Sequence, residues 1–227
     1  MAIVTTENLS KEYQQGALLV PALREVSLTI EAGEFTALMG PSGSGKTTLL
    51  NIIGGLDAPT SGRVVVDGVD LAKVSAAERS RLRLNRLGFV FQAYNLIPVL
   101  SAYENAEFVL LLQGRGEAER KKAVLEMLDE VGLKGLGGRR PNELSGGQQQ
   151  RVAVARAIAS QPALVLADEP TANLDSKTGR ELIDTMRQLN AERGVTFLFA
   201  THDHKVIEQA HRVVRLVDGQ VAEDIKR

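Results

Sequence analysis

The sequence contains no cysteine among its 227 residues. This absence excludes disulfide bonds, thiolate catalysis and cysteine-based metal sites, and it fits a reducing compartment. Aromatic residues make up only 4% of the chain, and positive and negative charges nearly cancel, leaving a formal net charge of -1. Because a balanced charge gives no general attraction to nucleic acid, we expect no nucleic acid partner.

Long hydrophobic runs are also missing. The longest apolar stretch, residues 108–112, is far shorter than the roughly 20 residues that a membrane-spanning helix needs. The first 13 residues lack the basic start and the long apolar centre of a secretory signal, so we expect the protein to stay where it is made. A chain of 227 residues suits one sizeable α/β domain with subdomains, spanning residues 1–227, better than two independent domains.

Outside one central stretch, the chain alternates between β and α character. Continuous apolar segments such as residues 164–166 predict a parallel sheet that is buried on both faces, and such a sheet carries its functional loops at the carboxyl ends of the strands. The predicted strands span residues 2–5, 23–30, 35–39, 63–66, 87–91, 163–167, 195–200 and 213–217, and the predicted helices of this part span residues 46–53, 145–159 and 178–192.

The central stretch has a different composition. After Gln92 the pattern becomes helical, most clearly over residues 101–133. A segment of about fifty residues exceeds an ordinary loop, so we predict a helical subdomain over residues 93–142, inserted into the α/β core. Its apolar stripe is expected to comprise Val124, Leu125, Leu128 and Val131.

A glycine-rich loop of the form G-x-x-x-x-G-K-[ST] lies between a predicted strand and a predicted helix. Such a loop turns successive backbone N–H groups toward a phosphate and leads into a helix whose positive end faces it. Lys46 would neutralise the β- and γ-phosphates of a nucleoside triphosphate, and Thr47 would place its hydroxyl on Mg²⁺. The predicted nucleotide contacts here are Gly40, Pro41, Ser42, Gly43, Ser44, Gly45, Lys46, Thr47 and Thr48.

A second segment predicts another helix start that faces a phosphate. In it Ser145 offers a hydroxyl, and the adjacent glycines offer N–H groups that no Cβ obstructs. One nucleotide does not need both helix starts from the same chain. We therefore predict a two-fold dimer, in which the glycine-rich loop of one copy and this second motif of the other close on the same triphosphate. The second motif consists of Leu144, Ser145, Gly146, Gly147 and Gln148.

Three polar side chains follow predicted strands. Asp168 is placed to hold the coordination shell of Mg²⁺, and Glu169 is expected nearer the γ-phosphate as the general base that activates water. Gln92 would supply a side-chain oxygen to Mg²⁺ or to the attacking water, although a lone glutamine at a strand end is more often only a polar boundary residue. These assignments predict hydrolysis of the triphosphate.

Two further residues are candidates for nucleotide contact. His202 follows the predicted strand 195–200, where an imidazole would steady the γ-phosphate in the transition state. Tyr13 precedes the glycine-rich loop and offers a flat face for stacking on adenine, with packing in the core as the alternative. Asn173 and Asp175 lie either on the dimer seam or in a helix-entry turn that Asp175 caps.

Together these motifs resemble the ATP-binding subunit of an ABC transporter, in the order typical of that family and over nearly the whole chain. The resemblance implies an α/β P-loop NTPase core of the RecA-like kind, with an N-terminal antiparallel β-subdomain and an inserted helical subdomain. It implies a head-to-tail dimer that closes on two ATP with Mg²⁺ and reopens after hydrolysis. The helical insertion and the Gln92 loop would contact an integral membrane permease, which would place the chain in the cytoplasm on the inner face of the cell membrane.

Within that family, residues 87–98 and 168–175 are similar to the lipoprotein-release and macrolide-exporter branch, whose permeases transmit motion to extracytoplasmic domains. Ala172 departs from this branch, in which many members carry glycine. Two alternatives stay open. One is a cell-division ABC ATPase that acts on wall hydrolases through a membrane partner, and the other is a soluble ABC ATPase of DNA repair or translation.

Overall fold

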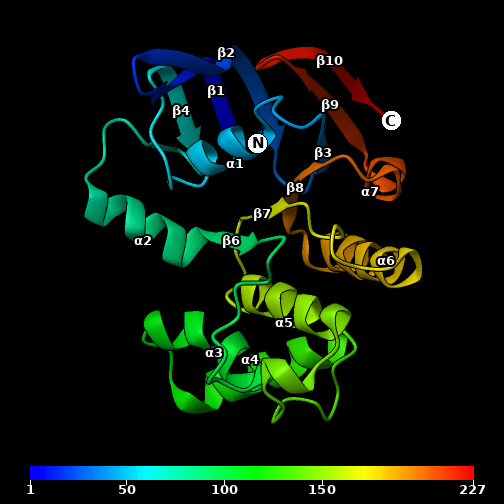
Figure 1. Ribbon diagram of the computed structural model, residues 1–227. Helices are drawn as coiled ribbons and strands as arrows, with labels where there is room; N and C mark the ends of the chain where they lie inside the picture. Colours follow the sequence, from blue (N-terminus) through cyan, green and yellow to red (C-terminus); the bar gives the residue numbers. More distant parts are fainter.

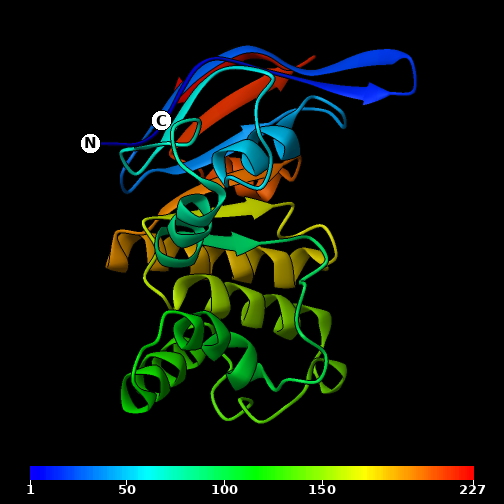
Figure 2. The same cartoon turned by 90° about the vertical axis from the view of Figure 1, so that its left-hand side faces the viewer.

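The computed structural model describes the backbone of residues 1–227 and the side chains of all of them except residue 205. An antiparallel sheet, a larger and mostly parallel sheet, and a group of helices follow one another along the molecule (Figure 1). The larger sheet lies between the other two parts, so its loops are close to both (Figure 2).

The antiparallel sheet has the strand order β2-β1-β4-β5. Its first two strands form a long hairpin that reaches beyond the rest of the sheet (Figure 2). They are longer than the predicted strands 2–5 and 23–30, because the outer part of the hairpin pairs only with itself and lacks the apolar alternation of a core strand. The four strands are β1 (Ala2–Gln15), β2 (Leu18–Glu31), β4 (Ser61–Val66) and β5 (Val69–Asp70).

The larger sheet has the order β10-β9-β3-β8-β7-β6, and all of its neighbouring pairs are parallel except β10 with β9. The prediction of a parallel sheet is therefore confirmed, with the functional loops after β3, β6, β7 and β8 at one edge. The strands are β3 (Phe35–Met39), β6 (Leu87–Val90), β7 (Leu164–Asp168), β8 (Thr196–Thr201), β9 (Arg212–Val217) and β10 (Gln220–Lys226).

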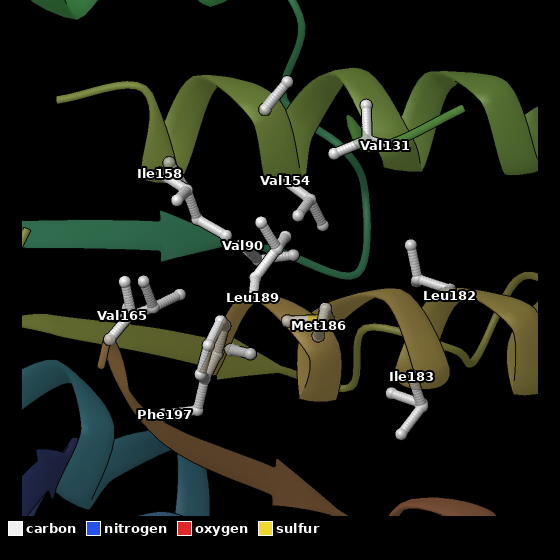
Figure 3. Packing of buried hydrophobic residues seen from close by; sticks show 14 of the residues in the cluster. Val90, Val131, Val154, Ile158, Val165, Leu182, Ile183, Met186, Leu189 and Phe197 are labelled. Atoms are coloured by element: carbon white, nitrogen blue, oxygen red, sulfur yellow. The ribbon is translucent and has the colours of Figure 1, made fainter. Parts of the chain in front are cut away.

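Both faces of this sheet are buried. On one face, Val165 of β7 and Phe197 of β8 pack against helices α5 (Gly146–Ile158) and α6 (Ser176–Arg193), whose apolar side chains point toward the strands (Figure 3). On the other face, Leu38 and Leu198 belong to a second cluster with α1 (Lys46–Ile53) and the antiparallel sheet. The apolar stripe of α6 is buried, since Leu182, Ile183, Met186 and Leu189 are each at most 2% exposed.

The chain leaves the larger sheet after β6 and returns to it through α5. Between them lie α3 (Ala102–Leu112), α4 (Glu117–Glu130) and the short 3₁₀ helix Pro141–Glu143, at the end of the molecule away from the antiparallel sheet (Figures 1 and 2). The predicted helical stretch 101–133 is broken near Gly114, which has a left-handed φ of 73°. The boundaries 93–142 of an inserted subdomain stay a prediction.

The prediction that Leu125 belongs to the apolar stripe of this helical region is wrong. Leu125 is 49% exposed, whereas Val124, Met127, Leu128 and Val131 are at most 3% exposed. The reason is the helical period: positions i, i+3, i+4 and i+7 share one face, and residue 125 lies beside that face.

Two further helices, α2 (Ala76–Arg86) and α7 (His204–Gln209), lie on the core. None of the helices in the described part of the chain is long and apolar enough to cross a membrane.

Arg212 links the two sheets. Its guanidinium donates to the Thr29 carbonyl of β2 and pairs with Glu34 and with Asp224 of β10. Only 7% of the Arg212 side chain is exposed, so these contacts are shielded from water. Gly219 adds backbone hydrogen bonds to Ser44 and Arg24. The antiparallel sheet, which carries Tyr13, is thereby fixed relative to the glycine-rich loop.

Candidate nucleotide-binding site

A pocket of about 550 Å³ lies at the carboxyl edge of the larger sheet. It brings together residues of β1, the loop after β3, and the ends of β6, β7 and β8, which are far apart in the sequence. Most of the predicted site residues are among them. The lining comprises Tyr13, Ala22, Ser42, Gly43, Ser44, Gly45, Lys46, Thr47, Thr48, Gln92, Glu169, Ala172 and His202.

The loop between β3 and α1 requires glycine at two positions. Gly45 has a left-handed φ of 97°, and a Cβ there would lie 2.5 Å from the Ala22 carbonyl oxygen. A Cβ on Gly40 would lie 2.3 Å from the Leu216 carbonyl oxygen. Because Gly45 is also the N-cap of α1 and has no side chain to cap it, the first N–H groups of the helix are left for an external acceptor.

Lys46 is folded back over this loop. Its ammonium donates to the Gly40 carbonyl at 2.7 Å and to the Pro41 carbonyl at 3.0 Å, and only 8% of the residue is exposed. These acceptors are neutral, and no ion pair with a carboxylate forms within the described chain. The positive charge is thus held near the loop N–H groups, in a place suited to an anionic ligand.

Asp168 ends β7 and faces the first turn of α1. The Thr47 hydroxyl donates to one of its carboxylate oxygens at 3.1 Å. Burial raises the pKa of the Asp168 carboxyl, and the neighbouring Glu169 raises it further, while the bond from Thr47 and the charge of Lys46 act in the opposite direction. A cation beside Asp168 and Thr47 would relieve this cost of burial.

Glu169 has a left-handed backbone, with φ of 46°. Such a conformation is uncommon outside glycine, and here a hydrogen bond from the Glu169 N–H to the Ala200 carbonyl, 2.8 Å long, holds it. One carboxylate oxygen lies 2.7 Å from Nδ1 of His202, and the other accepts from the Thr201 hydroxyl at 3.2 Å. The side chain is therefore oriented into the pocket by β8, while His202 remains mostly exposed.

The Gln92 loop follows β6 and is held by several distant side chains. Asn173 donates to the backbone carbonyl of Gln92 at 2.9 Å. The Gln92 residue itself is exposed and lines the pocket. Tyr94 and Asn95 both have positive φ angles, and Arg156 of α5 donates to both of their carbonyls. The loop is thus tied to α5, a connection that no local sequence signal predicted.

Tyr13 lies at the rim of the pocket and is 37% exposed. Its hydroxyl donates to Asp57 at 2.8 Å. This exposure does not fit the alternative of core packing. Asp175, by contrast, caps α6 by accepting from the Lys177 and Thr178 N–H groups, as the helix-entry alternative expected.

The second motif is not among the residues that line this pocket. It starts α5, and both ribbon views show α5 separated from α1 by β6 and β7 (Figures 1 and 2). Ser145 and Gln148 form a reciprocal capping box at that helix start. Within one chain, the predicted nucleotide contacts therefore lie in two separate places.

The two glycines of this motif also have contacts that sequence reasoning missed. A Cβ on Gly147 would lie 2.4 Å from the Thr178 side chain of α6, and one on Gly146 would lie 2.9 Å from the Tyr94 hydroxyl. Close packing within the chain thus requires small residues there. A larger pocket, of about 820 Å³, lies on the helical region between α3 and α4, and its lining includes no part of the glycine-rich loop.

The chain is similar to known proteins over almost its whole length. The sequence model described as ABC transporter matches residues 23–172. The lipoprotein-releasing system ATP-binding protein LolD of Anaeromyxobacter dehalogenans is 47% identical, with 97% of this chain and 93% of that protein covered. The macrolide export ATP-binding/permease protein MacB of Rhodopirellula baltica is 45% identical over 96% of this chain, which spans 32% of that protein.

A solved structure is also similar. It is the dimeric structure of a post-hydrolysis state of the ATP-binding cassette MJ0796 bound to ADP and Pi, with a TM-score of 0.91, 45% identity and 98% of each chain covered. The MJ0796 protein of Methanocaldococcus jannaschii carries the name of an uncharacterized ABC transporter ATP-binding protein.

A parallel sheet with a glycine-rich phosphate loop after β3 and two adjacent carboxylates, Asp168 and Glu169, at the end of β7 defines the class of P-loop ATPases. Within that class, the matches over most of the chain are specific. The chain belongs to the ABC transporter family, as a subunit that binds and hydrolyses ATP.

Proposed function

We propose that this subunit closes two ATP molecules between two copies of itself and that closure drives a membrane permease. The observation that carries the proposal is the separation of the two predicted nucleotide contacts. The pocket with Lys46 contains no residue of the Ser145 motif, although both motifs lie at a helix start, where N–H groups favour an anion. Two chains related by a two-fold axis would bring the motifs together.

In this proposal the glycine-rich loop binds the phosphates. The N–H groups at the start of α1 and the Lys46 ammonium hold the β- and γ-phosphates, and Tyr13 stacks on the adenine. The acceptors of Lys46 are two backbone carbonyls, which phosphate oxygens replace on binding.

The residues at the end of β7 fit a magnesium ion. Mg²⁺ prefers oxygen ligands, and the Thr47 hydroxyl, which lines the pocket, is hydrogen-bonded to the Asp168 carboxylate, while Gln92 lines the same pocket. We propose that Thr47, Asp168 and Gln92 hold Mg²⁺ together with the phosphates. The ion would supply charge neutralisation on the transferring phosphoryl group.

Glu169 is proposed as the general base. Thr201 and the backbone of β8 fix its carboxylate at the pocket wall, where it accepts a proton from the attacking water. His202 lies within hydrogen-bond distance of that carboxylate and is mostly exposed, and we propose that its imidazole contacts the γ-phosphate.

Ser145→Arg tests the composite site. In a Glu169→Gln background, we expect the protein with Ser145→Arg to remain monomeric in Mg-ATP while still binding ATP through Lys46. Arginine at this exposed helix start keeps the chain folded but adds bulk and charge where the partner's triphosphate would lie. Light scattering after size exclusion measures the mass, and calorimetry measures ATP binding. An ATP-dependent dimer of the double variant contradicts the proposed seam.

A groove beside the Gln92 loop is the proposed permease contact. It has a volume of about 340 Å³, lies between α2, β6 and α5, and combines apolar side chains such as Leu56 and Phe91 with Arg83 and Arg156. Neither arginine pairs with a carboxylate in the described part of the chain, since both donate to backbone carbonyls. A permease helix with an apolar ridge and acidic side chains complements this groove.

The groove predicts which surface captures the permease. We expect Leu56→Asp to abolish co-purification of an integral membrane protein from detergent-solubilised membranes, because it puts a carboxylate into the apolar part of the groove. Ile225→Asp is the matched control, since Leu56 and Ile225 are 50% and 49% exposed but Ile225 lies on β10, away from the groove and from the helical insertion. Equal loss of the membrane protein with both variants contradicts this assignment.

The similarity to LolD and MacB supports a place in the lipoprotein-release and macrolide-exporter branch. A permease of that branch would hold the chain at the cytoplasmic face of the membrane. No observation favours the cell-division or DNA-repair alternatives.

A further inference from the structure

The Tyr13 ring has a charged side chain on one of its faces. The Lys11 ammonium lies 4.8 Å from the centroid of the ring, within the range of a cation–π contact. Only 13% of the Lys11 side chain is exposed, so the contact is enclosed rather than freely solvated. Tyr13 nevertheless lines the nucleotide pocket, and a base can therefore approach only the face of the ring opposite Lys11.

Asp57 holds both of these side chains. One carboxylate oxygen accepts from the Lys11 ammonium at 2.8 Å, and the other accepts from the Tyr13 hydroxyl at 2.8 Å. Lys11 also donates to the Ala58 carbonyl at 2.7 Å. Asp57 follows α1, the helix that the phosphate loop leads into, so the ring is fixed with respect to the phosphate-binding elements.

The charges in this cluster support the arrangement. Burial alone would raise the pKa of the Asp57 carboxyl, but the bonds from Lys11, Tyr13 and the Ala58 N–H lower it below its usual value. Burial and the bond to Asp57 raise the pKa of the Tyr13 hydroxyl, with Thr48 acting in the opposite direction. At neutral pH the tyrosine thus remains the donor and the aspartate the acceptor.

We propose that Lys11 and Asp57 are positioning residues that hold the Tyr13 ring as a one-sided platform for the base of the nucleotide. The inference rests on the proposed stacking of adenine on Tyr13 and extends it to two residues that do not touch the nucleotide. Lys11 closes one face of the ring, and Asp57 fixes the ring's tilt through the hydroxyl. The fixed ring loses less freedom when a base stacks on it, so the platform strengthens binding of the base without contacting it.

A positioning role of Lys11 and Asp57 predicts an effect on binding of the base and none on binding of the phosphates. Lys11 and Asp57 should contribute to the affinity for ATP but not to the affinity for inorganic tripolyphosphate, which has no base and uses only the loop and Lys46. A merely structural pair, which fastened the hairpin to the loop after α1, would change the binding of both ligands equally. Tripolyphosphate is therefore the probe that distinguishes positioning from general loosening.

The experiment measures the Kd of Mg-ATP and of Mg-tripolyphosphate by calorimetry for Lys11→Met, Asp57→Asn and Tyr13→Ala. We expect Tyr13→Ala to weaken ATP about 10-fold, the usual scale for loss of one base–aromatic stack. Lys11→Met and Asp57→Asn are expected to weaken ATP about threefold to fivefold, with tripolyphosphate affinity within about twofold of the parent. Lys11→Arg should retain most of the parent's affinity for ATP. In Lys11→Met and Asp57→Asn, KM for ATP should rise by a larger factor than kcat falls.

The matched controls are Lys134→Met and Asp129→Asn, which break another lysine–aspartate pair, with a 3.0 Å contact, outside the nucleotide pocket. If Tyr13→Ala leaves ATP affinity unchanged, the proposed stacking itself is wrong. If Tyr13→Ala weakens ATP and the Lys11 and Asp57 variants do not, or if these variants weaken tripolyphosphate as much as ATP, the positioning role is overturned and the stacking site stands.

Discussion

Glu169→Gln lowers the rate of ATP hydrolysis by about 10²-fold or more, in the range that general-base catalysis contributes. The amide cannot accept the proton of the attacking water, but it keeps the size of the carboxylate and the contact with Thr201. The affinity for ATP should stay within about threefold of the parent, because binding rests on Lys46 and the loop N–H groups rather than on Glu169.

Steady-state phosphate release measures this prediction, and calorimetry in Mg-ATP checks that binding is retained. Glu208→Gln on the exposed surface of α7 is the matched control and should hydrolyse ATP at the parent rate. Undiminished turnover of Glu169→Gln would remove Glu169 from the role of base and leave the adjacent carboxylate, Asp168, as the candidate.

Lys46→Met weakens ATP binding by about 100-fold or more. Hydrogen bonds between charged partners contribute about 1.5–3 kcal/mol each, and loss of two such contacts to phosphate oxygens corresponds to at least a 100-fold change in Kd. Methionine nearly matches the length of lysine and fits the same buried path, which is only 8% exposed in the parent. The loss should therefore come from the missing charge and not from a collapsed loop.

Calorimetry with ATP and with tripolyphosphate measures the effect, and both ligands should be weakened alike because Lys46 serves the phosphates. Lys122→Met, at an exposed lysine of α4, is the control. If Lys46→Met binds ATP within about threefold of the parent, the phosphates do not lie on this loop, and the assignment of the pocket fails.

The sequence specifies the loop around Lys46 and the carboxylates of Asp168 and Glu169 in different ways. The loop around Lys46 could be predicted in detail, since its glycines answer a local requirement of φ and of close approach that a few consecutive residues express. Asp168 and Glu169 were predicted from their place after an apolar strand, and the parallel sheet does bring them beside the loop.

Features that depend on contacts between distant residues could not be predicted. Arg156 holds the Gln92 loop from 61 residues away, and Lys11 meets Asp57 across 46 residues, and neither pair leaves a pattern in the sequence. Leu125 is apolar and follows Val124 directly, but it lies about 100° around the helix from Val124, so composition alone does not show that it is exposed. The long β1–β2 hairpin was underestimated because its outer pairs carry no apolar alternation.

The mass of Glu169→Gln, measured by size exclusion with light scattering with and without Mg-ATP, tests whether two copies of the chain share their nucleotide sites. Blocked hydrolysis should hold the closed state, so we expect a monomer of 24.5 kDa without nucleotide and a dimer of twice that mass with Mg-ATP. Adding Ser145→Arg should return the protein to the monomeric mass in Mg-ATP. A Glu169→Gln chain that binds ATP, as calorimetry would show, yet stays monomeric at every nucleotide concentration contradicts the shared sites.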